Sequence, residues 1–121
     1  MQTPADFRFP KSARLLTSRE FQQVSSRGRR FTSRYFILLT RDVPLEPTRM
    51  GITVSRKVGN AVQRNRVKRI IREAFRLRRS MLKPGLECVV IAKPLAGQTV
   101  NAELDLNLRE LLAHHEVRVS V

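Results

Sequence analysis

The chain has 121 residues, of which 24 are Lys or Arg and 10 are Asp or Glu, giving a formal net charge of +14 at pH 7. This length predicts one domain, residues 1–121, and the apolar fraction of 41% argues against a disordered basic tail. The single cysteine, Cys88, excludes an internal disulfide, and no stretch approaches the roughly 20 apolar residues of a membrane span. We therefore expect a cytoplasmic protein with a polyanionic partner.

A first helix is predicted near the N-terminus. Residues 1–11 are polar and contain two prolines, so we expect a loosely ordered arm before that helix. Thr17 with Glu20 three residues later is a capping-box pattern, which places the start of the helix at Thr17. Gly28 is typical of the position just past a helix end, so the helix should end near Arg27.

Strand structure follows the first helix. Residues 31–41 are rich in aromatic and β-branched residues and predict strand with a break near Ser33. Apolar side chains alternate onto both sides of this segment, so both faces of the sheet should be partly covered. After a loop with two prolines, residues 49–55 alternate large apolar residues with Gly, Thr and Ser. This second segment should have one apolar face and one small, open face that leaves room for a ligand or a closely packed neighbour.

The longest predicted helix is also the most basic part of the chain. Asn60 and Gln63 form a second capping-box pattern, and the sequence Lys83-Pro84-Gly85 ends the helix. About 20 residues at 1.5 Å each give a rod of about 30 Å. Residues 56–79 contain ten Lys or Arg and one acidic residue.

A strand and a helix complete the predicted order αβββαβα. Residues 87–92 form a short apolar run typical of a buried strand, and residues 101–115 carry leucines at helical spacing. Because the long helix joins two strands, the segment is a βαβ unit whose strands should be parallel. Crossovers of this kind are right-handed by default.

A projection of the long helix at about 100° per residue separates three surfaces. The apolar stripe lies within about 80° of Val67 and comprises Val67, Ile70, Ile71, Ala74, Phe75 and Leu77. The cationic ridge beside it comprises Asn65, Lys68, Arg69, Arg72, Arg76 and Arg79. Arg66 and Glu73 lie on the opposite flank. Because like charges at this spacing repel one another, a ridge of one sign favours a nucleic-acid partner over a merely solvated face.

The segment from Gly51 to Arg76 contains a recognisable signature. It reads GITVSRKVGNAV, followed by RNRVKR and then REAFR. This series resembles the bacterial ribonuclease P protein subunit, whose RNR motif corresponds here to Arg64-Asn65-Arg66. The resemblance extends over nearly the whole chain, from Phe9 to the last helix.

The resemblance implies a subunit of the ribonucleoprotein endonuclease that removes the 5′ leader of precursor tRNA. In that family the RNA subunit performs the hydrolysis with Mg²⁺, which it mainly holds, and the protein assists. No catalytic or metal-binding residue is therefore expected in this chain. The implied partners are the catalytic RNA and precursor tRNA, with no membrane and no obligate protein partner. The implied fold is α+β, a two-layer αβββαβα sandwich of the ribosomal-protein-like kind with a left-handed βαβ crossover.

The resemblance also implies two RNA-binding surfaces. Residues at the start of the long helix would bind the catalytic RNA, namely Arg56, Lys57, Asn60, Arg64 and Arg66. A cleft between the first helix and the sheet would take the single-stranded leader, with aromatic faces that stack on bases. The residues implied for this cleft are Phe21, Tyr35, Phe36, Asn65, Lys68, Arg69 and Arg72. Ser25 stands where many relatives carry a second aromatic residue, which leaves the strength of leader binding open.

Two alternatives are an RNA-binding protein of the ribosome without a processing role and an independent RNA hydrolase. No two acidic residues lie together near the cationic ridge, as a metal-dependent phosphodiesterase would require. His114 and His115 are adjacent, so on a helix they point about 100° apart and do not share a ligand geometry. The sequence therefore favours a binding role for the protein itself.

Overall fold

The computed structural model describes residues 18–43 and 47–114. The described helices and strands follow the predicted order and are α1 (Ser18–Arg27), β1 (Arg29–Thr32), β2 (Phe36–Asp42), β3 (Arg49–Thr53), α2 (Ala61–Arg78), β4 (Leu86–Ala92) and α3 (Asn101–Leu112). Within the described ranges, three short 3₁₀ turns were not predicted, and they are η2 (Arg56–Val58), η3 (Arg79–Met81) and η4 (Pro94–Gln98). The N-terminal arm, the cap at Thr17 and His115 lie outside the described residues.

The four described strands form one mixed sheet in the order β1-β2-β4-β3. The predicted break near Ser33 is confirmed, because β1 and β2 pair as an antiparallel hairpin around it. The backbone N–H of Ser33 donates to the carbonyl of Phe36 at 2.9 Å and closes this turn. β2 pairs antiparallel with β4, and β3 pairs parallel with β4. The predicted parallel βαβ unit is therefore β3–α2–β4; its left hand stays an implication of the resemblance.

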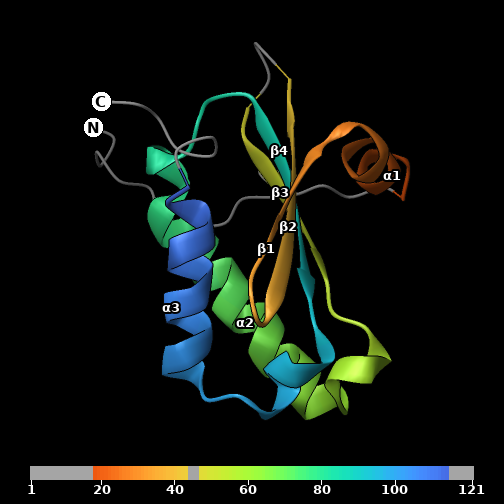
Figure 1. The fold of residues 1–121 in the computed structure, drawn as a ribbon, viewed down its shortest axis with the longest axis vertical. Helices are drawn as coiled ribbons and strands as arrows, with labels where there is room; N and C mark the ends of the chain where they lie inside the picture. Colours follow the sequence, from red (N-terminus) through yellow and green to blue (C-terminus); the bar gives the residue numbers. More distant parts are fainter. Residues whose placement is uncertain (1–17, 44–46, 115–121) are drawn as a thin grey trace, which may run out of the picture.

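The two faces of the sheet are covered by different helices (Figure 1). α2 and α3 lie on one face and form two layers with the sheet, whereas α1 packs on the other face, so the predicted two-layer sandwich has a partial third layer. The larger core lies between the sheet and α2 and α3, and its largest members are Phe36, Leu38, Met50, Ile71, Phe75, Leu86, Leu104 and Leu108. The smaller cluster under α1 contains Val24, Leu39 and Val89. Both faces of β2 are thus covered, as its alternating pattern predicted.

The long helix α2 begins and packs as the sequence indicated. The Asn60 side chain accepts a hydrogen bond from the N–H of Gln63, and the Gln63 side chain accepts one from the N–H of Asn60, each at 2.9 Å. This reciprocal capping box satisfies two backbone donors that the helix itself leaves open. In the apolar stripe, Leu77 is the exception, because it is 44% exposed. It lies about 80° from Val67 on the side of the partly buried Ile70, at the edge of the stripe that borders Arg66 and Glu73.

Cys88 lies on β4 inside the larger core and is fully buried. Burial raises the pKa of its thiol to about 12, so the group stays protonated at neutral pH. The interpretation of Cys88 as a small buried hydrophobe is confirmed. No helix among the described residues is long and apolar enough to cross a membrane.

Candidate nucleic-acid interface

The cationic ridge of α2 points away from the core. Asn65, Arg69 and Arg72 are exposed, and Lys68, Arg76 and Arg79 are partly exposed. Glu73 forms a two-pronged ion pair with Arg76, which lowers the pKa of Glu73 and raises the pKa of Arg76. Within residues 18–43 and 47–114, no acidic side chain pairs with Lys68, Arg69 or Arg72. The middle of the ridge therefore carries positive charge that its described surroundings do not balance.

A short turn before α2 presents two further cations. Arg56 and Lys57 are exposed on η2, and the Ser55 hydroxyl accepts the N–H of Lys57 at 3.3 Å. Gly59 ends the turn with a φ of 154°, a conformation that favours glycine. A Cβ at Gly59 would also lie 2.0 Å from the Gln63 side-chain oxygen that completes the capping box. The end of the turn at Gly59 therefore packs closely against the capping box at the start of α2.

The two arginines of the RNR motif differ in what surrounds them. Arg64 is partly exposed, and its Nε is a buried nitrogen without a hydrogen-bond partner among the described residues. Arg66 donates instead to four acceptors between residues 96 and 101. The structure therefore turns the Arg66 guanidinium toward the protein, whereas the family resemblance implied that Arg66 binds the catalytic RNA.

On the other face of the sheet, α1 is attached by packing and by charge. The Phe21 ring lies against Gly51, where a Cβ would sit 2.5 Å from ring carbon Cζ. The small face predicted for the second strand segment is therefore filled in part by a closely packed neighbour. Arg49 bridges Glu20 on α1, at 2.6 Å, and Glu87 on β4, at 2.5 Å. Although burial by itself lowers the pKa of Arg49, the hydrogen bonds to Glu87 and Glu20 raise it.

The register of the strands places three rows of side chains on this α1 face. The row of charges is Arg41, Glu87 and Arg49, and the buried row is Leu39, Val89 and Gly51. The third row, which we call the open row, crosses all four strands as Thr32, Ile37, Ile91 and Thr53. Its members are partly or fully exposed. Sequence reasoning missed this row, because the alternation within each strand does not reveal which residues become neighbours.

Two of the aromatic residues assigned to the cleft lie elsewhere. Phe36 is 0% exposed and Tyr35 is 4% exposed, and both belong to the larger core. Side chains alternate along a strand, and Phe36 shares its face with Leu38, so its ring lies opposite Phe21 across the sheet. The prediction that Tyr35 or Phe36 forms the floor of a leader cleft is therefore corrected.

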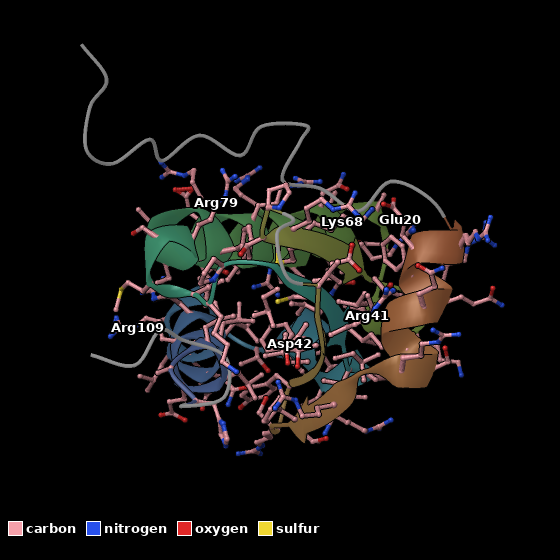
Figure 2. The ribbon with its side chains drawn as sticks, turned by 90° about the horizontal axis from the view of Figure 1, so that it is seen from above. Glu20, Arg41, Asp42, Lys68, Arg79 and Arg109 are labelled. Atoms are coloured by element: carbon pink, nitrogen blue, oxygen red, sulfur yellow. The ribbon has the colours of Figure 1, made fainter. Side chains whose placement is uncertain are left out.

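Phe21 and the ridge meet at the edge strand β3. This strand has β4 as its only described neighbour in the sheet, with Phe21 packed over its Gly51 and α2 against its other side. Figure 2 shows Lys68 of α2, Arg79 at the start of η3 and Glu20 of α1 along the same edge of the molecule. The β3 edge thus brings together the start of α1, the ridge and one end of the open row.

The described residues do not form a metal site. Among residues 18–43 and 47–114, no group of three or more His, Cys, Asp or Glu side chains is arranged to hold a metal ion. The acidic residues nearest the ridge and the open row, Glu20, Glu73 and Glu87, are engaged with arginines. This donor set does not fit a resident Mg²⁺, so we assign no step to a metal held by this chain.

The fold and this surface define an α+β protein whose longest helix presents an unbalanced cationic face, a class suited to polyanions. Comparison with known proteins is more specific. Residues 9–116 match the family model of Ribonuclease P. The chain belongs to this family, the protein component of ribonuclease P, whose known role is 5′ processing of tRNA.

Relatives and solved structures agree with this assignment. The chain is 40% identical to the ribonuclease P protein component of Desulforapulum autotrophicum over 87% of its own length and 90% of that protein. It is 42% identical to the component of Bacillus velezensis, with coverage of 84% and 87%. The solved structure of the Staphylococcus aureus RNase P protein superposes with a TM-score of 0.83 at 31% identity and covers 90% of this chain and 100% of that one. The family resemblance and the fold class are therefore confirmed.

Proposed function

We propose that this protein holds the catalytic RNA of ribonuclease P with the start of α2 and the 5′ leader of precursor tRNA along the β3 edge. The RNA subunit would perform the hydrolysis with Mg²⁺ that it mainly holds, in the cytoplasm. The observation that carries this proposal is the run of exposed cations from η2 along α2, which its described surroundings leave unbalanced. Such a surface lowers its own repulsion by binding phosphates.

The catalytic RNA would meet η2 and the first turns of α2. Arg56 and Lys57 are exposed there, and Asn60 keeps its side-chain amide group outward while its oxygen serves the capping box. Arg64 supports this assignment, because its side chain is partly exposed and pairs with no acidic side chain among the described residues. A planar guanidinium can offer two parallel donors to one phosphate group.

The leader would lie across the open row, between Phe21 and the ridge. Ile37 and Ile91 offer an apolar surface to unstacked bases, and Phe21 offers a partly exposed ring. Asn65, Lys68, Arg69 and Arg72 would neutralise the leader backbone from the α2 side of the edge strand. These groups contact phosphates and base faces, so they would accept leaders of many sequences.

A reconstituted cleavage assay tests this function against the alternatives. Precursor tRNA is incubated with the protein alone, with the catalytic RNA alone and with both, over a series of Mg²⁺ concentrations. We expect no cleavage by the protein alone and cleavage at lower Mg²⁺ with both subunits than with the RNA alone. Cleavage by the protein alone would establish the hydrolase alternative. If adding the protein left the Mg²⁺ requirement unchanged, the result would favour the other alternative, an RNA-binding protein of the ribosome without a processing role.

A further inference from the structure

The Arg66 guanidinium holds residues 96–101 through four hydrogen bonds, which we call the clamp. Its Nη1 donates to the Thr99 carbonyl at 2.9 Å and to the Asn101 side-chain oxygen at 2.6 Å. Its Nη2 donates to the carbonyls of Gly97, at 3.0 Å, and Ala96, at 3.4 Å. All four terminal N–H donors of the guanidinium thus have acceptors inside the protein, which leaves only Nε for any other partner.

The acceptors belong to η4 and to the segment that leads into α3. The N-cap of α3 is Val100, which supplies no side-chain hydrogen bond, and Asn101 directs its oxygen to Arg66. The start of α3 therefore depends on α2 for its position. The sequence separation of 30 to 35 residues between Arg66 and these acceptors makes the clamp a tertiary contact.

The segment that Arg66 holds packs in turn on η2. Gly97 lies so close to the Val58 carbonyl that a Cβ at this glycine would be 1.8 Å from the oxygen. Val58 is buried, and it directly follows Arg56 and Lys57 in the same turn. A continuous series of contacts therefore runs from Arg66 through Gly97 to the turn that carries these two exposed cations.

We propose that Arg66 is a positioning residue that holds η4 against η2 and thereby fixes Arg56 and Lys57 for the catalytic RNA. This role rests on the proposed function, because it requires that η2 contacts the RNA subunit. The two arginines of the RNR motif then have separate tasks, with Arg64 facing the RNA and Arg66 facing the protein. Lysine would not replace Arg66, because its three donors diverge from one nitrogen and do not span these four acceptors.

The test combines a double-mutant cycle with the salt dependence of binding. The variants are Arg66→Gln, Asn101→Ala and both together, with Arg64→Gln as the matched control, and each is assayed as the full chain for affinity to the catalytic RNA. A lost phosphate contact lowers the slope of log K against log salt by roughly 0.7 to 0.9, whereas loss of a positioning contact leaves it nearly unchanged. Amide hydrogen exchange of residues 94–101 reports on η4 directly.

We expect Arg66→Gln to lower the affinity about tenfold with an almost unchanged salt slope, and to speed exchange in residues 94–101. Asn101→Ala, which removes no charge, should lower the affinity less and add little to Arg66→Gln in the double variant. Arg64→Gln should lower the slope and leave the exchange unchanged. A slope loss for Arg66→Gln equal to that of Arg64→Gln, with additive effects of Asn101→Ala, would overturn the proposal.

Two controls keep the outcomes distinct. Thermal unfolding of each variant establishes that the binding assay uses folded protein, and Arg66→Lys serves as a milder variant that keeps the charge; we expect it to show the loss of affinity without a loss of slope. If Arg66→Lys bound like the wild type, charge alone would suffice and the clamp would be refuted. If the wild type did not prefer the catalytic RNA over an unrelated RNA of equal length, the proposed function itself would fail.

Discussion

In the part of the chain that the structure describes, one face of the sheet is covered by two helices, α2 and α3, and the other by the single short helix α1. Under α2 and α3 the contacts are almost entirely apolar, with Phe36 and Phe75 both fully buried. Under α1 only Val24, Leu39 and Val89 are buried in the described cluster, and the ion pairs of Arg49 supplement them. This difference indicates that apolar burial on the face covered by α2 and α3 supplies most of the folding free energy. The second face can therefore leave the open row accessible.

The largest expected effect is on the closed face. Phe75→Ala removes a fully buried ring from the larger core, so we expect the free energy of unfolding to fall by about 3 to 5 kcal/mol. Leu77→Ala, two residues away and 44% exposed, should cost less than about 0.5 kcal/mol. Urea unfolding followed by circular dichroism measures both. Comparable losses would mean that the core does not end where the structure places it.

A smaller loss of stability is expected from the ion pairs under α1. Arg49→Met leaves Glu87, a carboxylate with a 7% exposed side chain, with only Arg41 nearby, at 3.7 Å. Removal of one partner from a buried ion pair lowers the free energy of unfolding. We expect a loss of about 2 to 3 kcal/mol here, at the low end for such pairs, because Arg49 is partly exposed. Arg29→Met, which breaks the exposed pair with Asp42, should change stability by less than about 0.5 kcal/mol. Equal effects in the same unfolding experiment would show that α1 is not held by this network.

The comparison of faces also predicts a difference in substrate binding. Phe21→Ala should lower the affinity for leader-bearing precursor tRNA about tenfold, because one stacking surface is lost. The affinity for mature tRNA should stay nearly unchanged. Phe31→Ala is the matched control, since Phe31 is also a partly buried aromatic residue but packs on the larger core. Binding titrations with the reconstituted ribonucleoprotein provide the measurement. If Phe21→Ala lowered the affinities for both tRNAs equally, Phe21 would not belong to the leader-binding surface.

A prediction of a different kind concerns the chemical reactivity of Cys88, within the closed face. Because burial raises its pKa to about 12, the thiolate is scarce at pH 8 in the folded protein. Iodoacetamide should then react at least about a hundredfold more slowly with the folded chain than with the urea-unfolded chain. Mass spectrometry of the alkylated protein follows both rates. Fast alkylation of the folded chain would show that the larger core opens readily near β4.

Features set by neighbouring residues could be predicted from the sequence. The capping box of Asn60 and Gln63 involves residues three apart, and the break at Ser33 lies within one hairpin. The exposed cationic ridge follows from helical geometry alone, once α2 is placed with its apolar stripe inward. For these features the local signal and the folded structure coincide.

Features set by distant residues could not be predicted in this way. The acceptors of Arg66 lie in η4 and beyond, and no local pattern indicates that this arginine would turn inward. The alternation of residues 35–39 shows that Phe36 and Ile37 point to opposite faces, but not which face α1 covers. The open row likewise depends on the register of four strands. Each of these required the tertiary arrangement.

The central claim is that the α2 surface, and not net charge alone, binds the catalytic RNA. The most direct measurement compares two triple variants that lose the same charge, the α2 triple Arg56, Lys57 and Arg64→Gln on η2 and the start of α2, and the β1 triple Arg27, Arg30 and Arg34→Gln around β1 at the opposite edge of the sheet. We predict that the salt slope of binding falls by roughly two to three in the α2 triple and by less than about one in the β1 triple. Equal slopes in the two triples would contradict the account.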